Sequence, residues 1–352
     1  MRAWRVERQA PIEKHPLSLV EIEPPRPAAD ELLVRVRACA VCRTDLHVVE
    51  GDLALRRSPT IPGHQVVGDV VDCGAKVRER VAGGRIGERV GVAWLHRTCG
   101  RCRFCAGGRE NLCEAAQFTG WTAPGGFAEF VTVPDAFAHP LPADLPAEET
   151  APLLCAGIIG YRALRIAGLL DHAAGREPFR LGLWGFGAAG HLALQVARAR
   201  GAEVFVCTRD RERHQALARE LGAAWVGGAE DLPPAKLDAA VIFAPAGELV
   251  PAALRALDKG GRLVLGGIHM SDTPPLPYEL LYHERSIHTV AHNTREDARA
   301  FLAEAARAGV TAHRRTFPLE QADQALLALK RDAIRGAAVL VINPPPTRAP
   351  QP

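Results

Sequence analysis

The sequence predicts an α/β protein in which a β-rich domain surrounds an inserted domain built on a doubly wound parallel sheet. The chain has 352 residues, and this length exceeds what one hydrophobic core usually serves, so two domains are expected. The first 155 residues show short strand patterns broken by Gly and Pro, and strand and helix patterns alternate after them. A last helix and a last strand follow residue 291.

The β-rich part contains several short runs of Val and Leu between glycines. These runs predict strands within residues 31–36, 63–74, 87–92 and 125–133. Strands this short, with turn residues between them, are typical of a domain made mainly of sheet.

The alternating part begins with a complete βαβ unit at 181–208. It gives a strand, a glycine turn, a helix with Leu192, Val196 and Ala199 on one face, and a second strand. The pattern then continues as helix 211–222, strand 237–245, helix 249–261 and strand 262–267. Repeated units of this kind predict a parallel sheet with right-handed crossovers and helices on both faces.

The end of the chain is expected to return to the first domain. The helix at 296–309 and the strand at 337–343 cannot bury their apolar faces against each other alone. The predicted domains are therefore 1–155 with 292–343, and 156–291. The Pro-rich end, 344–352, is expected to be disordered.

Composition favours small-molecule chemistry. The chain is 47% hydrophobic and carries a net charge of +3, which is too balanced to predict nucleic-acid or anionic-lipid partners. It has no run of eighteen apolar residues and no apolar signal core at its start. We therefore expect a soluble, cytoplasmic protein without membrane partners.

Four cysteines crowd into fifteen residues, within a lobe at about 96–114. Four thiolates satisfy tetrahedral zinc completely, so this site is expected to be structural. The alternatives are two disulfides or an iron–sulfur cluster, but an odd total of nine cysteines without a secretory signal favours zinc. The four residues are Cys99, Cys102, Cys105 and Cys113.

Three further residues are candidates for a catalytic metal: Cys42, His64 and Cys155. Each alone would more often be an ordinary core residue. A catalytic zinc, however, needs three protein ligands and one open position, and two cysteines with one histidine form a known set.

On these motifs the chain resembles the zinc-dependent alcohol dehydrogenases of the medium-chain dehydrogenase/reductase superfamily. The resemblance covers nearly the whole chain and includes the signature Gly63-His64-x3-Gly68-x5-Gly74 and the segment around Cys155. It implies a GroES-like catalytic domain, a Rossmann nucleotide-binding domain, and two zinc ions per chain. It also implies that Cys42, His64 and Cys155 are the catalytic zinc ligands.

The resemblance assigns roles to neighbouring residues. Asp45 would orient His64 from behind, on the side away from the metal, although a loop cap is the alternative. Thr44 and His47 would relay the proton of the alcohol, unless His47 is an ordinary surface histidine. Arg43 would meet the cofactor pyrophosphate.

Two indoles would line the substrate pocket, and three positions depart from the family pattern. Trp94 and Trp121 match pocket positions, with a core role as the alternative. The departures are Gln65 in place of a Glu beside the metal, Ile159 in place of a Thr at the nicotinamide, and Gly336-Ala337-Ala338 in place of a Gly-Arg near the cofactor.

The glycine turn of the βαβ unit has the GxGxxG pattern of a dinucleotide site. It follows a strand and opens a helix, where backbone N–H groups can bind a pyrophosphate. The alternative is a tight turn without a ligand. The residues are Gly185, Gly187, Ala188, Ala189 and Gly190.

The end of the next strand predicts the cofactor. An NAD-binding domain normally has an acidic residue there, but this chain has Thr208-Arg209. A hydroxyl and a guanidinium suit a 2′-phosphate, so we expect NADP(H) to be preferred over NAD(H). Alternatively, Arg209 and Arg211 are solvated charges at a helix start.

The sequence therefore predicts a zinc-dependent oxidoreductase that acts on an alcohol, aldehyde or ketone. The alternatives are a polyol or aryl-alcohol dehydrogenase of the same family, and a non-catalytic nucleotide-binding scaffold that keeps the structural zinc. By resemblance, a homodimer or homotetramer is expected, joined through the strand near 285–290.

Overall fold

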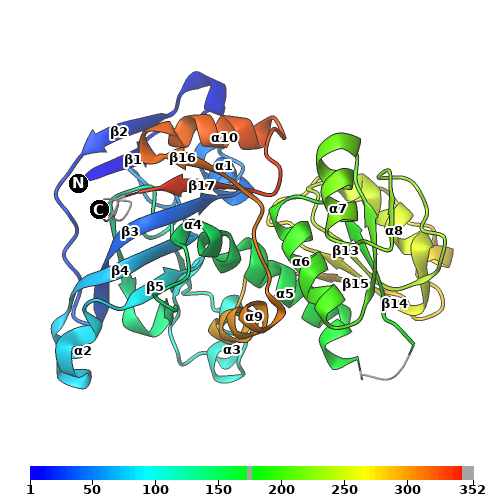
Figure 1. Ribbon diagram of the computed structural model, residues 1–352, viewed down its shortest axis with the longest axis horizontal. Coiled ribbons are helices and arrows are strands. Elements are labelled where there is room, and N and C mark those ends of the chain that lie inside the picture. The colour runs from blue at the N-terminus through cyan, green and yellow to red at the C-terminus, as the bar shows by residue number, and fades with distance from the viewer. Residues whose placement is uncertain (173–176, 343–352) are drawn as a thin grey trace, which may run out of the picture. The chain divides into compact units, whose positions relative to one another are not determined.

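The computed structural model describes residues 1–172 and 177–342 (Figure 1). The expected disordered tail at 344–352 lies outside the described residues. The chain divides into two compact units: unit 1 comprises Met1–Cys155 and the segment from Arg314 onward, and unit 2 comprises Ala156–His313.

Unit 1 is built mainly of short strands, as the sequence predicts. Its strands are β1 (Arg2–Val6), β2 (Leu17–Glu21), β3 (Glu31–Val41), β4 (Val66–Cys73), β5 (Arg89–Val92), β6 (Leu95–Arg97), β7 (Gln117–Phe118), β8 (Phe130–Pro134), β9 (Ala138–Pro140), β16 (Arg314–Pro318) and β17 (Ala337–Val341). Its helices are α1 (Arg43–Glu50), α2 (Ala75–Arg80), α3 (Arg103–Ala106), α4 (Ala147–Thr150) and α10 (Ala322–Lys330), with short 3-10 turns between them.

The long strand β3 organises the seven-stranded sheet of unit 1. It pairs antiparallel with β4, β8 and β17, and the sheet runs β16-β17-β3-β4-β5-β9. Leu32, Val34 and Val36 are buried, and they alternate with more exposed residues as the period-two pattern predicts. The strand therefore ends at Val41 with one face fixed against the core, directly before Cys42.

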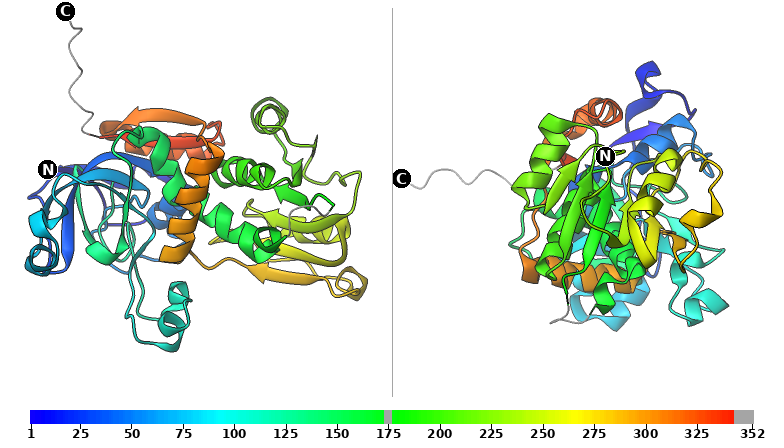
Figure 2. Two further views of the ribbon diagram at one scale, coloured as in Figure 1. Left: turned by 60° about the horizontal axis from the view of Figure 1, so that its bottom comes forward. Right: turned by 90° about the vertical axis from the view of Figure 1, so that its right-hand side faces the viewer.

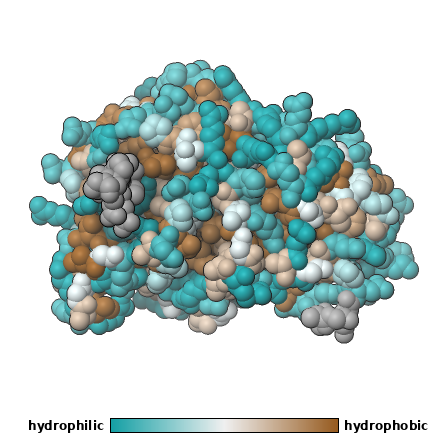
Figure 3. Space-filling view, viewed as in Figure 1, coloured by the Kyte–Doolittle hydropathy of each residue, from teal (hydrophilic) through white to brown (hydrophobic). Residues whose placement is uncertain are grey.

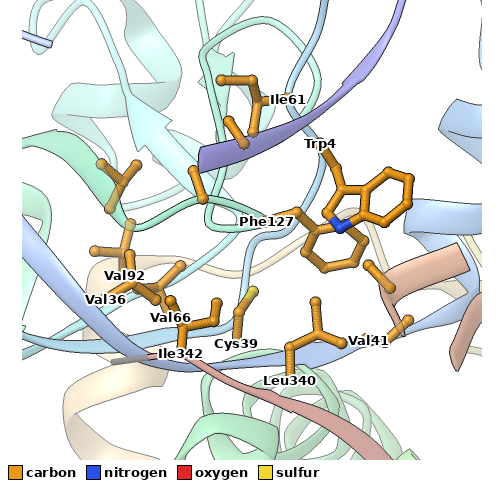
Figure 4. Packing of buried hydrophobic residues seen from close by; sticks show 14 of the residues in the cluster. Trp4, Val36, Cys39, Val41, Ile61, Val66, Val92, Phe127, Leu340 and Ile342 are labelled. Carbon is orange, nitrogen blue, oxygen red and sulfur yellow. The ribbon is translucent and has the colours of Figure 1, made fainter. Parts of the chain in front are cut away.

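The core of unit 1 lies against this sheet (Figure 4). Phe127 is completely buried, and Trp4 donates its indole N–H to the carbonyl of Leu319 at 2.7 Å. That contact joins the first strand to the segment between β16 and α10. It explains why the last strands belong to the same unit as the first 155 residues.

Unit 2 contains a parallel six-stranded Rossmann-like sheet. Its elements are α5 (Ala156–Ala167), β10 (Arg180–Trp184), α6 (Ala188–Ala199), β11 (Glu203–Cys207), the π-helical turn η7 (Arg211–Gln215), α7 (Ala216–Glu220), β12 (Trp225–Gly227), β13 (Leu237–Ile242), α8 (Val250–Ala256), β14 (Leu257–Leu265), β15 (Ser286–Thr289) and α9 (Arg295–Ala308).

The strand order of this sheet determines where a ligand can bind. The order is β12-β11-β10-β13-β14-β15, and every neighbouring pair is parallel. The chain moves outward in one direction after β10 and in the other after β13, so right-handed crossovers put α6 and α8 on opposite faces (Figure 2). The loop after β10 lies at this switch point, where such sheets bind ligands.

The second boundary between the units differs from the expected one. It lies between His313 and Arg314 rather than at 291/292. Helix α9 is packed within unit 2, because its Phe301 is completely buried and contacts the ring of Tyr161 in α5 at 5.9 Å. An amphipathic pattern predicts that one face of a helix is buried, but it does not show which element packs against that face.

The face drawn in Figure 3 is mostly hydrophilic, with smaller apolar areas between polar residues. Within the described residues, no helix combines the length and the apolar character needed to cross a membrane.

Candidate functional site

The first turn of α1 holds the centre of the candidate metal site. Cys42 is the N-cap residue of this helix, and its Sγ accepts the backbone N–H of Thr44 at 3.3 Å. Asp45 accepts the N–H of Cys42 with Oδ2 at 2.9 Å and the N–H of Gly63 with Oδ1 at 3.0 Å. One buried carboxylate therefore fixes two separate chain segments.

The same carboxylate orients the candidate histidine ligand. Asp45 Oδ1 lies 2.9 Å from Nδ1 of His64, and both side chains are 1% exposed. This contact leaves Nε2 of His64 directed at Cys42, with 3.2 Å between Nε2 and Sγ. Burial by itself would lower the pKa of His64, but the negative charges of Asp45 and Cys42 raise it to about 10.

Cys155, the last residue of the first segment of unit 1, completes the group. It follows the 3-10 turn η5 (Ala151–Leu154), and the ligand atoms of Cys42, His64 and Cys155 all lie within 4.8 Å of one another. The Cys155 thiol donates a hydrogen bond to Cys42, which lowers the pKa of Cys42 and raises the pKa of Cys155. Two sulfurs and one imidazole are donors that suit zinc and occupy three of its four positions.

The four-cysteine lobe forms a second ligand set. It follows β6 and includes α3 and the 3-10 turn η3 (Glu110–Leu112), and it projects from the rest of unit 1, in cyan in Figure 2. Sγ of Cys105 lies 3.5 Å from Sγ of Cys102 and 3.9 Å from Sγ of Cys99. Cys113 Sγ accepts the N–H of Cys99 at 3.5 Å, so all four sulfurs converge.

The expected relay residues lie together on α1. Thr44 and His47 are three residues apart and therefore lie on the same face of the helix. Nδ1 of His47 is 2.7 Å from Oδ2 of Asp52, a partner that the sequence did not indicate because it lies beyond the end of the helix. Arg43 is the first residue of α1 and is half-buried.

Gln65, the departure beside the histidine ligand, is 1% exposed. Its backbone carbonyl accepts the N–H of Ala40 at 3.0 Å, so strand pairing fixes its main chain next to His64. A neutral amide therefore replaces a carboxylate in a buried environment.

Three aromatic rings form a wall beside His64. The ring of Trp94 lies edge-on to His64 at 4.8 Å and stacks on Trp121 at 6.0 Å. Phe118 contacts both indoles, at 5.3 Å from Trp94 and 5.7 Å from Trp121. The sequence singled out the two Trp residues but not Phe118, which carries no motif, or Arg56, whose guanidinium lies over Trp121 at 5.1 Å.

In unit 2 the glycine motif joins β10 to α6. Gly185 has φ +86°, and a Cβ there would lie 2.8 Å from the backbone N of Ala244. Gly190 is also required, since its Cβ would lie 2.7 Å from the carbonyl of Gly185. At Gly187, the N-cap of α6, a Cβ would meet nothing within 4 Å, which leaves room beside the helix N-terminus.

The end of β11 has an acidic residue, but its carboxylate is engaged locally. Thr208 is 6% exposed and Arg209 is exposed. Asp210 accepts the backbone N–H of Arg213 at 2.7 Å and pairs with the Arg213 guanidinium at 2.6 Å. Its carboxylate therefore caps η7.

The other two departures lie in different units. Ile159 is a half-buried residue of α5 in unit 2, and Ala337 and Ala338 are buried in β17 of unit 1. Each is a regular part of its helix or strand, so these substitutions leave the local fold intact.

Comparisons with known proteins identify this combination of sites. Residues 28–143 match the alcohol dehydrogenase GroES-like domain, and residues 188–307 match the zinc-binding dehydrogenase domain. A probable alcohol dehydrogenase AdhA of Mycobacterium tuberculosis is 52% identical over 345 residues, which cover 97% of each chain. The chain belongs to the zinc-containing alcohol dehydrogenase family.

Two further relatives support the assignment. An alcohol dehydrogenase of Geobacillus stearothermophilus is 34% identical and aligns over 94% of this chain and 97% of its own length. The solved structure of a cinnamyl alcohol dehydrogenase from Sorghum bicolor superposes with a TM-score of 0.85 at 27% identity, covering 99% of both chains. The protein is thus an alcohol dehydrogenase with an NAD(P) cofactor, a structural zinc set of four cysteines and a Cys-His-Cys catalytic zinc set.

Proposed function

We propose that the protein oxidises aromatic alcohols and reduces the matching aldehydes and ketones, with NADP(H) as its preferred cofactor. The observation that carries the proposal is the ring of Trp94, which lies 4.8 Å from a histidine of the Cys-His-Cys set. An apolar, stacked wall beside the ligand set suits a planar aromatic substrate better than a polyol, whose hydroxyls would need polar partners.

Cys42, His64 and Cys155 would hold the catalytic zinc. When bound there, zinc supplies a Lewis acid that polarises the oxygen of the alcohol or carbonyl group. Asp45 accepts the Nδ1 proton of His64, which keeps Nε2 available as a ligand atom. Gln65 leaves the site one negative charge poorer than a glutamate would, which favours an electron-rich oxygen at the open position.

Thr44 and His47 would carry the proton of the alcohol. Thr44 lies two residues after Cys42 in the sequence. Its hydroxyl would accept the proton of the substrate oxygen, and His47 would transfer that proton onward. Asp52 holds Nδ1 of His47 at 2.7 Å and so orients the ring. Replacing His47 by Gln should lower kcat about 10- to 100-fold, since general acid–base groups contribute at least this much.

The glycine loop after β10 and the N-terminus of α6 would bind the cofactor pyrophosphate. When bound, the nicotinamide supplies the hydride acceptor or donor. The role of the protein is to hold the substrate and the cofactor in register and to exclude water.

Residues after the end of β11 support a preference for NADP(H). Arg209 is exposed and offers planar N–H donors for a 2′-phosphate, whereas the carboxylate of Asp210 is already bound to Arg213. Arg209→Gln should raise the KM for NADPH about tenfold, the loss expected for one charge-assisted contact. Arg211→Gln removes an exposed charge two residues away and serves as the control.

Two further features support an oligomer in the cytoplasm. Strand β15 is at the edge of its sheet and pairs only with β14 among the described strands, so a second copy of the chain could continue the sheet as a homodimer or homotetramer. None of the nine cysteines is joined in a disulfide in the described part of the chain, which suits a reducing cytoplasm.

One experiment tests the proposal as a whole. Protein with a measured zinc content is assayed with a panel of aryl, alkyl and polyol substrates and with both nicotinamide cofactors. Two zinc ions per chain, the highest kcat/KM for aryl substrates and a lower KM for NADPH than for NADH are expected. A clear preference for NADH would overturn the proposed cofactor, and a clear preference for polyols would overturn the proposed substrate class.

A further inference from the structure

An arginine lies at the far end of the aromatic wall described above. Going outward from His64, the ring of Trp94 follows at 4.8 Å, the ring of Trp121 at a further 6.0 Å, and the guanidinium of Arg56 lies 5.1 Å over Trp121. All four residues belong to unit 1. A positive charge thus lies at the end of a row of aromatic rings that begins at a candidate metal ligand.

The loop that carries this arginine is held in place by hydrogen bonds. The indole N–H of Trp121 donates to the carbonyl of Ala54 at 3.0 Å. The side chain of Gln9 donates to the carbonyl of Leu53 at 2.7 Å and accepts the N–H of Leu55 at 3.3 Å. The backbone before Arg56 is therefore fixed against the wall.

Arg56 lacks an internal counter-ion. Across residues 1–172 and 177–342, no carboxylate oxygen lies within the 4.0 Å ion-pair distance of its guanidinium. The acidic residue nearest along the chain, Asp52, lies 2.7 Å from His47. A cation–π contact with an indole does not use up the in-plane N–H groups of a guanidinium, which can still bind a carboxylate bidentately.

We propose that Arg56 is a specificity residue that binds an anionic group, namely a carboxylate, at the end of an aryl aldehyde or alcohol opposite the reacting carbon. This inference rests on the proposed function, because it assumes that the reacting carbon lies at the Cys-His-Cys set. The aryl ring would lie along Trp94 and Trp121, and the carboxylate would meet the guanidinium. A uniformly apolar pocket would instead disfavour a charged substrate, since the carboxylate would lose its hydration without a partner.

The experiment compares two aldehydes that differ only in the carboxylate, benzaldehyde and 4-carboxybenzaldehyde, on zinc-quantified protein with NADPH. The wild type should have the higher kcat/KM for the carboxylated aldehyde. Arg56→Gln should lower the ratio of the two kcat/KM values about tenfold, the size expected for one charge-assisted contact. Raising the salt concentration should lower the ratio in the wild type and affect it less in the variant.

Arg57→Gln is the matched control, because Arg57 is the neighbouring exposed arginine and its loss changes the net charge equally. This variant should keep the wild-type ratio. The inference would be overturned if the ratio of kcat/KM for 4-carboxybenzaldehyde to kcat/KM for benzaldehyde fell equally in both variants. It would also be overturned if the wild type preferred benzaldehyde. In both cases, turnover of benzaldehyde would still support the proposed function. If neither aldehyde is reduced by any form of the protein, the proposed function fails, and this inference fails with it.

Discussion

The two metal-ligand sets of unit 1 differ in how the chain builds them. The lobe gathers four cysteines from fifteen consecutive residues, and Cys99 is exposed. The Cys-His-Cys set gathers ligands from the start of α1, the segment before β4 and the turn before α5, and His64 is 1% exposed. One site is local and near solvent, whereas the other depends on the packing of the whole unit.

This contrast assigns the chemistry to the Cys-His-Cys set. Four sulfurs leave no open position on zinc, so the lobe can stabilise the fold but cannot take a substrate. Two sulfurs and an imidazole leave one position, and only this set has a buried carboxylate behind its histidine and an aromatic wall beside it. The four predictions that follow test this division of roles, in order of decreasing effect.

Removing one ligand of the buried set should have the largest effect on turnover. Cys42→Ala should lower kcat about 10³-fold or more, because Lewis-acid catalysis is worth several kcal/mol. Zinc analysis should find one ion per chain instead of two. Cys39→Ala, which changes a buried cysteine of β3 outside both ligand sets, is the control. Retention of full activity by Cys42→Ala would show that the Cys-His-Cys set does not hold the catalytic metal.

Neutralising the carboxylate behind the histidine should have the next largest effect. Asp45→Asn should lower zinc affinity or kcat about 10- to 100-fold, the usual cost of losing a partner of a metal-bound histidine. Competition with a chelator measures the affinity. Asp69→Asn, a carboxylate of β4 that pairs with Arg37 and Arg89, should leave metal binding intact.

A pH test probes the strand that leads into the lobe. Burial lowers the pKa of His96 in β6 to about 4. The unfolded chain, in which a histidine has a pKa of about 6.5, binds more protons between these values, so folding stability falls as pH falls from 7 towards 4. Between pH 7 and pH 5 this group should cost about 2 kcal/mol of unfolding free energy.

Denaturant unfolding at both pH values measures this loss. His96→Gln should lose less stability than the wild type on acidification, because a glutamine does not titrate. His172→Gln, at a partly exposed histidine, should behave like the wild type. An equal loss in the wild type and His96→Gln would show that the lobe strand does not contribute to the acid sensitivity.

Removing a ligand of the lobe should have the smallest effect on turnover. Cys99→Ala should lose the structural zinc and lower the Tm, since binding of a structural zinc is coupled to folding. The kcat of the folded protein, measured below its Tm, should change about twofold at most, because a closed site takes no part in the reaction. A loss of kcat as large as that of Cys42→Ala would contradict the division of roles.

Much of the fold follows from local sequence patterns. The βαβ unit, the glycine turn and the strands β3, β4, β5, β8 and β17 lie where hydrophobic periodicity predicts them, because each pattern is satisfied within a few residues. The placement of α9 could not be predicted in this way. Its apolar face fits either unit in principle, and the burial of Phe301 beside Tyr161 assigns it to unit 2.

The two metal-ligand sets also differ in how far the sequence predicts them. The spacing of Cys99, Cys102, Cys105 and Cys113 was sufficient to indicate a metal lobe, because ligands so close in sequence must be close in space. The convergence of Cys42, His64 and Cys155 needed a family resemblance at the sequence level. Their separations of 22 and 91 residues carry no local signal.

The α/β class, the lobe and the nucleotide turn follow from the amino-acid sequence, since these depend on short-range periodicity and spacing. Three contacts are visible only in the folded chain: Asp52 with His47, Phe118 with the two indoles, and the Arg56 guanidinium with the ring of Trp121. Such contacts depend on how distant loops fold back on a rigid sheet. Their energies come from packing and desolvation, which neighbouring residues in the sequence do not encode.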